Sequence, residues 1–200
     1  MTGLGFDVVV ISDWALPDLL SRVEAVLASD RRVAVQHRNP GVGDRLFTEQ
    51  AKALAAVCAR HHAPLFVNGR LEVALLTQAH LHLPATGLRA IDVRPALPTG
   101  RLLSAAVHSM TEAQPVDLAL VSPVFAPGSK PFDTRPVLGV TGFETLAAQL
   151  PCPAFALGGL SAATAGSLRH AAGLAVISEV VHADSPPDAL AKLRGAWHAA

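Results

Sequence analysis

Eight short apolar runs recur along the 200 residues, and they constrain the fold more than any other feature of the sequence. The runs are nearly continuous and lack the strict alternation of a sheet that has one face in water. This pattern is typical of parallel strands that are buried on both faces. The runs are FDVVVI from Phe6, RVAVQHR from Arg32, PLFVNG from Pro64, HLHLP from His80, RLLSAAVHS from Arg101, DLALVSP from Asp117, PAFALGGL from Pro153 and GLAVIS from Gly173.

Segments with helical periodicity separate several of these runs. Asp44 and Ser161 are residue types that cap helix starts, whereas Gly173 is a residue type that follows helix ends. Between the fourth and fifth runs, Pro95 and Pro98 allow at most a weak helix over residues 86–98. The clearer helices are predicted over residues 16–29, 44–62, 161–173 and 186–200.

Eight strand–helix units in this length predict an α/β fold, a single (β/α)₈ TIM barrel of minimal size. A doubly wound open sheet is the alternative arrangement of the same units. No linker or change of composition divides the chain, and no sequence repeat is evident. We therefore expect one domain over residues 1–200.

Composition limits the classes of partner and the compartment. Half of the residues are apolar, 16% are charged, and the formal net charge is zero, which favours a large core over disorder. The sequence contains no basic run of the kind that would indicate a nucleic-acid partner. Cys58 and Cys152 are distant in sequence and are expected to be small buried hydrophobes. The first residues lack a basic signal-peptide segment, and no apolar run is long enough to span a bilayer, so we expect a cytoplasmic protein without a membrane partner.

Seven short motifs lie at or after the predicted strands, in chain order: VQHRN, FVNGR, LHLP, VHSMTEA, SPVFAPGSK, FALGGL and AVISEV. Together, from about Val33 to Val180, they resemble the thiamine phosphate synthase/TenI family. This family contains thiamine phosphate synthase and the TenI-type thiazole tautomerase. The resemblance implies a barrel enzyme of thiamine biosynthesis whose ligand is a small phosphorylated thiazole or a related thiamine compound.

The segment SPVFAPGSK places one lysine, Lys130, after the sixth predicted strand. The resemblance implies that Lys130 closes over the phosphate of the substrate. An ammonium group suits this role, and the hydroxyl group of Ser129 can add a hydrogen bond. The alternative is a solvated loop lysine, which is the commoner situation for this residue type.

Gly158, Gly159 and Ser178 form a second predicted phosphate element. Two glycines at a strand end allow backbone N–H groups to approach an anion, and barrels often bind phosphate after strands seven and eight. The alternative is a tight turn that needs glycine only for its backbone freedom. Glu179 would repel an anion, so we expect its carboxylate to point away or to pair with a cation such as Arg169.

The residues that hold Mg²⁺ in the synthase have no counterpart in this sequence. The synthase joins a pyrimidine diphosphate to a thiazole phosphate with Mg²⁺ held by two aspartates. Those positions are Gly69 and approximately Gly87 here, and glycine offers no oxygen ligand from a side chain. Asn39 and Pro40 also replace a glutamate and a lysine of the family motif. We therefore expect no metal and no cofactor, although Asp92 could act as a substitute ligand.

The tautomerase reaction needs only a phosphate site, a carboxylate partner and an acid–base group. The resemblance places a catalytic histidine at His108, and imidazole can both accept and donate a proton near neutral pH. Arg38 would bind the substrate carboxylate, while Gln36 and Asn68 would position the ring. Some members carry a second histidine where this chain has Pro123, so a proton relay would be incomplete. A polar residue bonded to a backbone carbonyl is the alternative for His108, and a structural ion pair is the alternative for Arg38.

Three other interpretations stay open on the sequence. His37, His82 and His108 lie near strand ends and could bind Zn²⁺, as in a metal hydrolase, but alternation with Gln36 points His37 outward beneath a helix. The main prediction is a metal-independent, thiazole tautomerase-like isomerase. The alternatives are thiamine phosphate synthase and a non-catalytic binder of thiamine-related phosphates. Exposed apolar helix faces could also support a homodimer, although the sequence does not single out one face.

Overall fold

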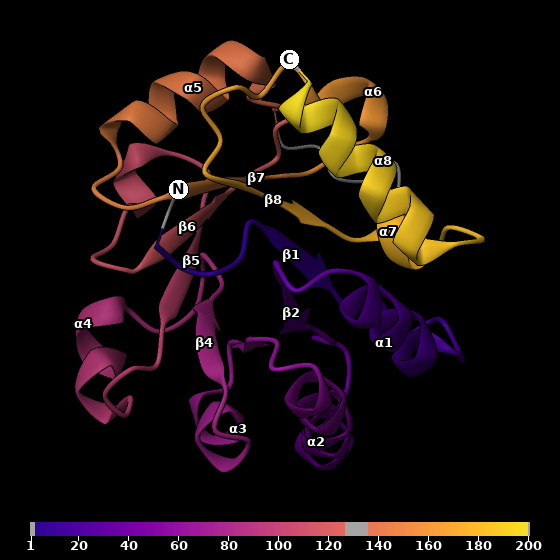
Figure 1. Cartoon of the computed structure of the whole chain (residues 1–200). Helices are drawn as coiled ribbons and strands as arrows, with labels where there is room; N and C mark the ends of the chain where they lie inside the picture. Colours follow the sequence, from indigo (N-terminus) through magenta and orange to yellow (C-terminus); the bar gives the residue numbers. More distant parts are fainter. Residues whose placement is uncertain (1–2, 127–135, 200) are drawn as a thin grey trace.

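Eight parallel strands close into a barrel in the computed structural model, which describes residues 3–126 and 136–199 (Figure 1). β1 pairs with β2 on one side and with β8 on the other, so the (β/α)₈ prediction is confirmed and the open sheet is excluded. Every strand lies within one of the eight apolar runs. The strands are β1 (Val8–Ile11), β2 (Val33–His37), β3 (Leu65–Asn68), β4 (His80–Leu83), β5 (Leu103–Val107), β6 (Leu118–Val121), β7 (Ala154–Leu157) and β8 (Gly173–Val176).

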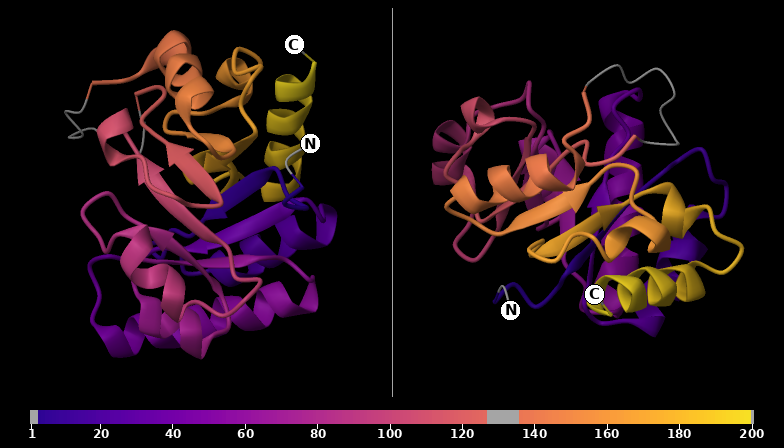
Figure 2. Two further views of the ribbon diagram at one scale, coloured as in Figure 1. Left: turned by 90° about the vertical axis from the view of Figure 1, so that its left-hand side faces the viewer. Right: turned by 90° about the horizontal axis from the view of Figure 1, so that it is seen from above.

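Helices surround the strands on the outside of the barrel, as the two further views in Figure 2 show. The segment after β4 forms only a short helix and a 3₁₀ turn, as its prolines predicted. The helical elements are α1 (Leu19–Ser29), α2 (Asp44–Arg60), α3 (Leu71–Leu76), α4 (Ala90–Val93), η1 (Arg94–Ala96), η2 (Met110–Glu112), α5 (Gly139–Gln149), α6 (Ala162–Ala165), α7 (Ser178–Val181) and α8 (Pro186–His198).

Several helix boundaries differ from the predicted ones, and α1 begins only at Leu19. Asp44 is not the N-cap of α2, because Gly43 takes that place and Asp44 lies in the first turn, where it pairs with Arg70 at 2.9 Å. The Ser161 cap is confirmed, with Thr164 completing a capping box. The helix does not continue to residue 173, however. The indole of Trp197 in α8 donates a hydrogen bond to the Leu168 carbonyl, which a continuing helix would have used internally.

The lower part of the barrel interior, at the amino ends of the strands, is filled by aromatic rings. Phe6 packs against Phe66 and Phe155, with ring centroids 5.9 and 5.8 Å apart. Gly173 makes room for this cluster, since a Cβ atom there would lie 2.2 Å from the Phe155 ring. Close packing of this kind closes the amino end of the barrel.

Polar side chains replace the aromatic ones toward the carboxyl ends of the strands. Gln36, His82, Ser104 and Ser122 are all buried, with at most 7% of their surface exposed. Strand register aligns part of this polar layer, because Asn68 lies opposite His82 and His82 lies opposite Ser104. The interior therefore changes from apolar to polar along its axis, which positions a site at the carboxyl end.

An ionic cluster joins α8 to the start of β1. Asp7 is buried, and its carboxylate forms ion pairs with the guanidinium groups of Arg32 at 2.7 Å and Arg194 at 2.6 Å. Arg194 also pairs closely with Asp30 after α1. Since breaking a buried pair leaves an uncompensated charge, this cluster fixes α8 against the barrel.

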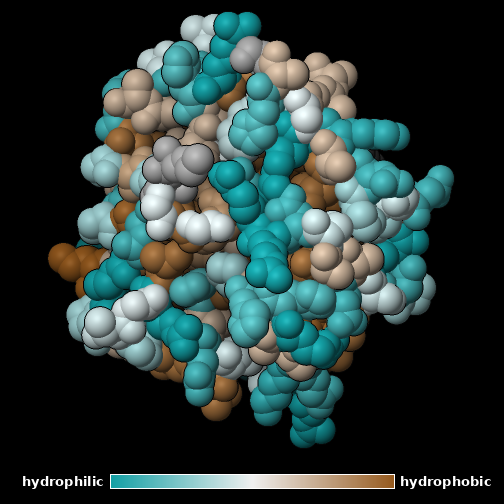
Figure 3. Space-filling view, viewed as in Figure 1, coloured by the Kyte–Doolittle hydropathy of each residue, from teal (hydrophilic) through white to brown (hydrophobic). Residues whose placement is uncertain are grey.

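The surface is mostly polar, with apolar side chains at a few positions. In Figure 3 these lie chiefly at the left and lower edges of the face, where Figure 1 places α4 and α3. Within the described residues, no helix is long and apolar enough to cross a membrane. No single apolar face stands out, so a homodimer stays a prediction. The exposed large apolar residues are Leu46, Leu75, Leu76, Leu88, Ile91, Met110 and Val137.

Candidate functional site

His108 lies directly after β5 and is held by a carboxylate four residues later. Its Nδ1 atom is 2.7 Å from Oε2 of Glu112, and the same oxygen accepts the His108 backbone N–H at 2.8 Å. The 3₁₀ turn η2 bends the chain back so that Glu112 reaches His108. A carboxylate at Nδ1 holds an imidazole in one orientation, which is the arrangement of a positioned acid–base group.

His82 forms the floor of the polar layer. Its Nδ1 atom lies 2.8 Å from the hydroxyl group of Ser104 on the neighbouring strand. Burial, and then the charge of Arg38, lowers the pKa of His82 to about 3, so the imidazole is neutral at pH 7. A neutral ring that hydrogen-bonds Ser104 can contact a ligand ring without adding charge.

Arg38 continues the inward face of β2 two residues beyond Gln36. Its backbone is fixed by Ser12, whose hydroxyl group accepts the Arg38 N–H at 2.9 Å and donates to the Arg38 carbonyl at 3.2 Å. The effect of Arg38 on His82 shows that its guanidinium charge acts on the polar layer. The structure therefore brings Arg38 to the mouth of the barrel, which is where a substrate carboxylate was predicted.

Gln36, Asn68 and Ser122 supply further polar groups to the same layer. Gln36 is 2% exposed and Ser122 7% exposed, and neither side chain hydrogen-bonds another of the described residues. Neither residue is among the buried side chains with a fully shielded and unpaired polar atom, so these polar groups keep some access to solvent. Polar groups of this kind at the end of a barrel are available to hydrogen-bond a ligand.

Gly158 and Gly159 lie after β7 in left-handed conformations, with φ of +100° and +61°. Their neighbours also require glycine, because a Cβ atom at Gly159 would lie 2.6 Å from the Ala126 carbonyl oxygen and 2.7 Å from Phe125 Cβ. Tight packing against the β6 exit therefore explains both glycines without a ligand. The same turn leaves the Gly159 N–H without an acceptor among the described residues.

Ser178 begins the short helix α7 after β8, beside this turn in the closed barrel. The expectation for its neighbour Glu179 was wrong. Glu179 neither points away nor pairs with Arg169, because its carboxylate accepts a hydrogen bond of 3.2 Å from the Ala162 N–H at the start of α6. A carboxylate near a helix start is stabilised by the N-terminal N–H groups, which explains its position.

Two predicted phosphate ligands, Ser129 and Lys130, lie outside the described residues. Their roles stay predictions. The other seven predicted site residues lie in the last two residues of a strand or after its end, at the carboxyl side of the barrel.

The zinc interpretation is contradicted by the position of His37. Its ring is fully buried beneath α2, with Nε2 3.1 Å from the Phe47 carbonyl oxygen, and its Nδ1 accepts the Trp14 indole N–H at 3.1 Å. This outward orientation separates it from the other two histidines, as alternation predicted. Across residues 3–126 and 136–199, no three histidine, cysteine or acidic side chains are arranged to hold a metal ion.

Comparison with known proteins places this barrel among its relatives. The sequence model of a family described as "Thiamine monophosphate synthase" matches residues 8–180. The chain belongs to the thiamine monophosphate synthase family. A thiamine-phosphate synthase from Chlorobium luteolum is 34% identical over 167 residues, covering 80% of this chain and 78% of the relative. A solved structure, thiamine phosphate pyrophosphorylase from Pyrococcus furiosus, superposes with a TM-score of 0.83 at 25% identity and covers 98% of this chain and 96% of its own.

Other relatives in the thiamine monophosphate synthase family are longer. A thiamine-phosphate synthase from Synechococcus sp. (strain WH7803) is 32% identical over 183 residues. The match covers 88% of this chain but only 51% of that relative, so the chain spans about half its length. The family assignment confirms the resemblance drawn from the seven motifs.

The backbone at the family's Mg²⁺ positions is adapted to glycine in this member. Gly69 has a φ of +75°, a left-handed conformation that glycine adopts without strain. A Cβ atom at Gly87 would lie 2.9 Å from two atoms of the Pro84 ring. Asp92, the possible substitute, is engaged by Arg89 at 2.8 Å on the surface. These residues do not fit a Mg²⁺ site, so no step of the mechanism is derived through a metal.

Sequence reasoning missed Glu112, Ser104 and Ser122 as members of the site. Glu112 could have been found, because a carboxylate four residues after a histidine at a strand end is within reach of it when the chain turns. Ser104 could have been found by alternation, since it lies an even number of residues before His108 on the same run. No predicted site residue marked the inward face of β6, so alternation gave no such signal for Ser122.

Proposed function

We propose that this chain is a metal-independent isomerase that moves a proton on a phosphorylated thiazole carboxylate, in the manner of a thiazole tautomerase. The observation that carries the proposal is the 2.7 Å pair of His108 and Glu112 at the mouth of the barrel. A histidine oriented by a carboxylate is a suitable general acid–base group. The glycine-adapted positions 69 and 87 favour a reaction without Mg²⁺ over the coupling reaction.

The proposed step conserves protons and electrons. The imidazole of His108 removes a proton from one ring position of the substrate and returns a proton at another, so the ring becomes aromatic without net oxidation. Glu112 stabilises the imidazolium that exists between the two transfers. No leaving group departs, which is why no pyrophosphate site is needed.

The remaining residues bind and orient the substrate. Arg38 pairs with its carboxylate, because a guanidinium matches a carboxylate with two parallel hydrogen bonds. Gln36 and Asn68 donate hydrogen bonds to the ring above His82. The phosphate lies between the Gly158–Gly159 turn and Ser178, with Ser129 and Lys130 as further ligands. We take residues 1–200 to act as one barrel domain.

A direct assay tests this function. The purified chain is mixed with the non-aromatic tautomer of the carboxylated thiazole phosphate, and aromatisation is followed by ultraviolet absorbance in the presence of EDTA. Turnover is expected, and His108→Asn should reduce kcat by about 100- to 10,000-fold. Absence of turnover in EDTA at any substrate concentration would reject the proposal.

The chain offers a matched control for the catalytic pair. His170 and Glu144 form a second pair with the same 2.7 Å Nδ1–carboxylate distance, but His170 is on the surface. His170→Asn should leave turnover unchanged. An equal loss in His108→Asn and His170→Asn would indicate a general effect of removing such a pair rather than catalysis by His108.

Thiamine phosphate synthase is the second candidate, and the names of the relatives favour it. On those names alone, the chain would join a pyrimidine diphosphate to a thiazole phosphate. The same preparation is therefore given both coupling substrates with and without Mg²⁺, and release of pyrophosphate is measured. Mg²⁺-dependent release would establish the synthase, whereas ligand-induced stabilisation without any turnover would indicate a non-catalytic binder.

A further inference from the structure

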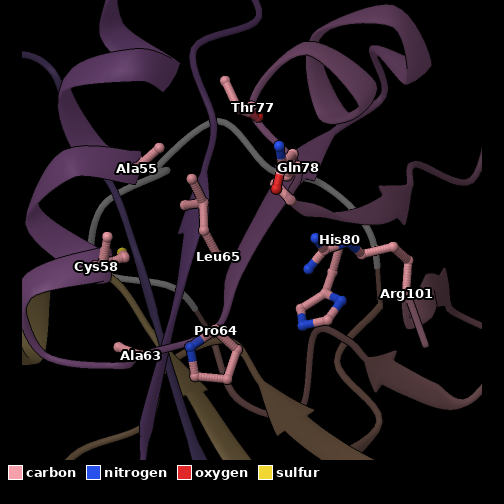
Figure 4. Close-up of a pocket in the computed structure, with 11 residues that line it drawn as sticks. Ala55, Cys58, Ala63, Pro64, Leu65, Thr77, Gln78, His80 and Arg101 are labelled. Atoms are coloured by element: carbon pink, nitrogen blue, oxygen red, sulfur yellow. The ribbon is translucent and has the colours of Figure 1, made fainter. Parts of the chain in front are cut away.

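A second cavity lies at the opposite end of the barrel from the proposed active site. Its volume is about 280 Å³, and it is lined by the amino ends of β3, β4 and β5 together with the last turns of α2 and α3 (Figure 4). The lining residues are Ala55, Cys58, Ala59, Ala63, Pro64, Leu65, Thr77, Gln78, Ala79, His80 and Arg101. None of the proposed catalytic or phosphate-binding residues belongs to it.

Arg101 gives this cavity a positive charge that the protein does not neutralise. Figure 4 shows the Arg101 side chain extending toward His80 and Gln78. Its guanidinium group forms no hydrogen bond or ion pair with any other residue in the described part of the chain. No acidic side chain lines the cavity. The nearest acid that affects His80 is Asp117, which is already engaged by Arg94 at 2.8 Å.

The titratable neighbours do not compensate this charge. The Nδ1 atom of His80 accepts the Leu102 backbone N–H at 2.9 Å, so a neutral His80 ring carries its proton on Nε2 and can donate it. Burial, and then the charge of Arg101, lowers the pKa of His80 to about 4, which keeps the ring neutral at pH 7. Burial raises the pKa of the Cys58 thiol to about 12, so no thiolate forms there. No titratable side chain in the lining therefore carries a negative charge at pH 7.

The opposite wall of the cavity is apolar. Ala55, Ala63, Pro64 and Leu65 line it, and Figure 4 shows Pro64 and Leu65 across the cavity from His80 and Arg101. A volume of about 280 Å³ is smaller than that of sites for drug-sized ligands, which suits a single ring or a short aliphatic chain. A carboxylate matches the planar guanidinium better than a spherical anion does.

We propose that this cavity is a binding site for a small monocarboxylate with an apolar body, distinct from the proposed active site. The carboxylate pairs with Arg101 and accepts the Nε2–H of His80, and the apolar body packs against Pro64 and Leu65. The site goes beyond the proposed function, because it shares no residue with the phosphate or proton-transfer machinery.

Titration of the ¹⁵N-labelled chain with benzoate, followed by amide chemical shifts, tests this site. Benzoate should give saturable shifts of the Gln78, Ala79 and Leu102 amides with a Kd of about 1–10 mM, and neutral benzamide should bind at least about tenfold more weakly. Inorganic phosphate should bind more weakly than benzoate because it lacks an apolar body. Equal binding of benzoate and benzamide, tighter binding of phosphate, or shifts confined to the barrel mouth would overturn the proposal.

Variants locate the site. Arg101→Gln should weaken benzoate binding at least about tenfold, whereas Arg31→Gln removes an equal charge from an exposed position at the same end of the barrel and should change it less than about twofold. Ala59→Leu keeps the charge but narrows the exposed wall, so it should also weaken binding. Unchanged affinity in both Arg101→Gln and Ala59→Leu would exclude this cavity. The titrations with benzoate, benzamide and phosphate use the unaltered chain, so they can overturn the proposal even if a variant fails to fold.

Discussion

One carboxylate oxygen of Glu112 lies 2.7 Å from Nδ1 of His108 and 2.8 Å from the backbone nitrogen of the same residue. The ring and the backbone of His108 are therefore fixed by one atom. This arrangement defines which imidazole nitrogen faces Glu112, and it makes Glu112 the positioning residue for the proposed proton transfer.

Replacing Glu112 should lower turnover without weakening substrate binding. We expect Glu112→Gln to reduce kcat by about 10- to 100-fold with little change in KM, because the amide keeps the ring in place but does not stabilise an imidazolium. Steady-state kinetics of the tautomerisation measure both constants. Glu144→Gln, in the surface pair with His170, is the control and should alter neither. A rise in KM with unchanged kcat would assign Glu112 to substrate binding.

The buried neutral histidines should make the fold sensitive to acid. Burial lowers the pKa of His37 from 6.5 to about 4, so between these values the unfolded chain binds more protons than the folded one. The stability that His37 provides is complete above pH 6.5 and is lost as the pH falls toward 4. Urea unfolding measures the free energy of unfolding at each pH. Between pH 7 and 4, this free energy should fall by about 3 kcal/mol less in His37→Gln than in the unaltered chain.

His170→Gln is the control for the acid dependence, because His170 is exposed. It should leave the dependence on pH nearly unchanged. If His37→Gln and the unaltered chain lost the same free energy of unfolding between pH 7 and 4, His37 would not be a group that resists protonation.

Gly159 should tolerate no side chain. Gly159→Ala places a Cβ atom 2.6 Å from the Ala126 carbonyl oxygen in a left-handed conformation, and we expect it to cost about 2–5 kcal/mol of unfolding free energy. Gly100→Ala has the same backbone requirement, with φ of +84°, but no atom lies within 4 Å. It should cost only about 1–2 kcal/mol. Equal costs in chemical denaturation would show that the β6 exit does not restrict Gly159.

The contact of Gly87 with Pro84 can be measured as a coupling energy. Gly87→Ala should destabilise the fold by about 1–3 kcal/mol, because the new Cβ atom meets the proline ring at 2.9 Å. Pro84→Ala removes that ring, so the double variant should recover about 1 kcal/mol or more relative to the sum of the single variants. Strict additivity would mean that another neighbour restricts residue 87.

The barrel could be predicted because each strand is buried on both faces and is therefore marked by a continuous apolar run. The family resemblance turned Gln36 inward, and alternation then placed His37 outward. The end of α6 could not be predicted in the same way. The segment after it is fixed by a long-range contact, since Trp197 hydrogen-bonds the carbonyl of Leu168 from 29 residues further along the chain.

The candidate site could be predicted only in part, because several of its contacts join residues that are distant in sequence. The motifs located individual residues, but the influence of Arg38 on His82 and the bond between His82 and Ser104 depend on strand register across the barrel. Glu179 shows the opposite error. Its charge suggested a cationic partner, whereas the partial positive charge of backbone N–H groups at the start of α6 satisfied it.

The pairing of β1 with β8, from Val8 opposite Leu174 to Val10 opposite Val176, has a consequence for biosynthesis. While a ribosome is still making the chain, β1 has only one hydrogen-bonded neighbour, and its other edge stays open until residues 173–176 have emerged. An open strand edge can pair with other chains. Synthesis of nearly the whole barrel must therefore precede the protection of its first strand.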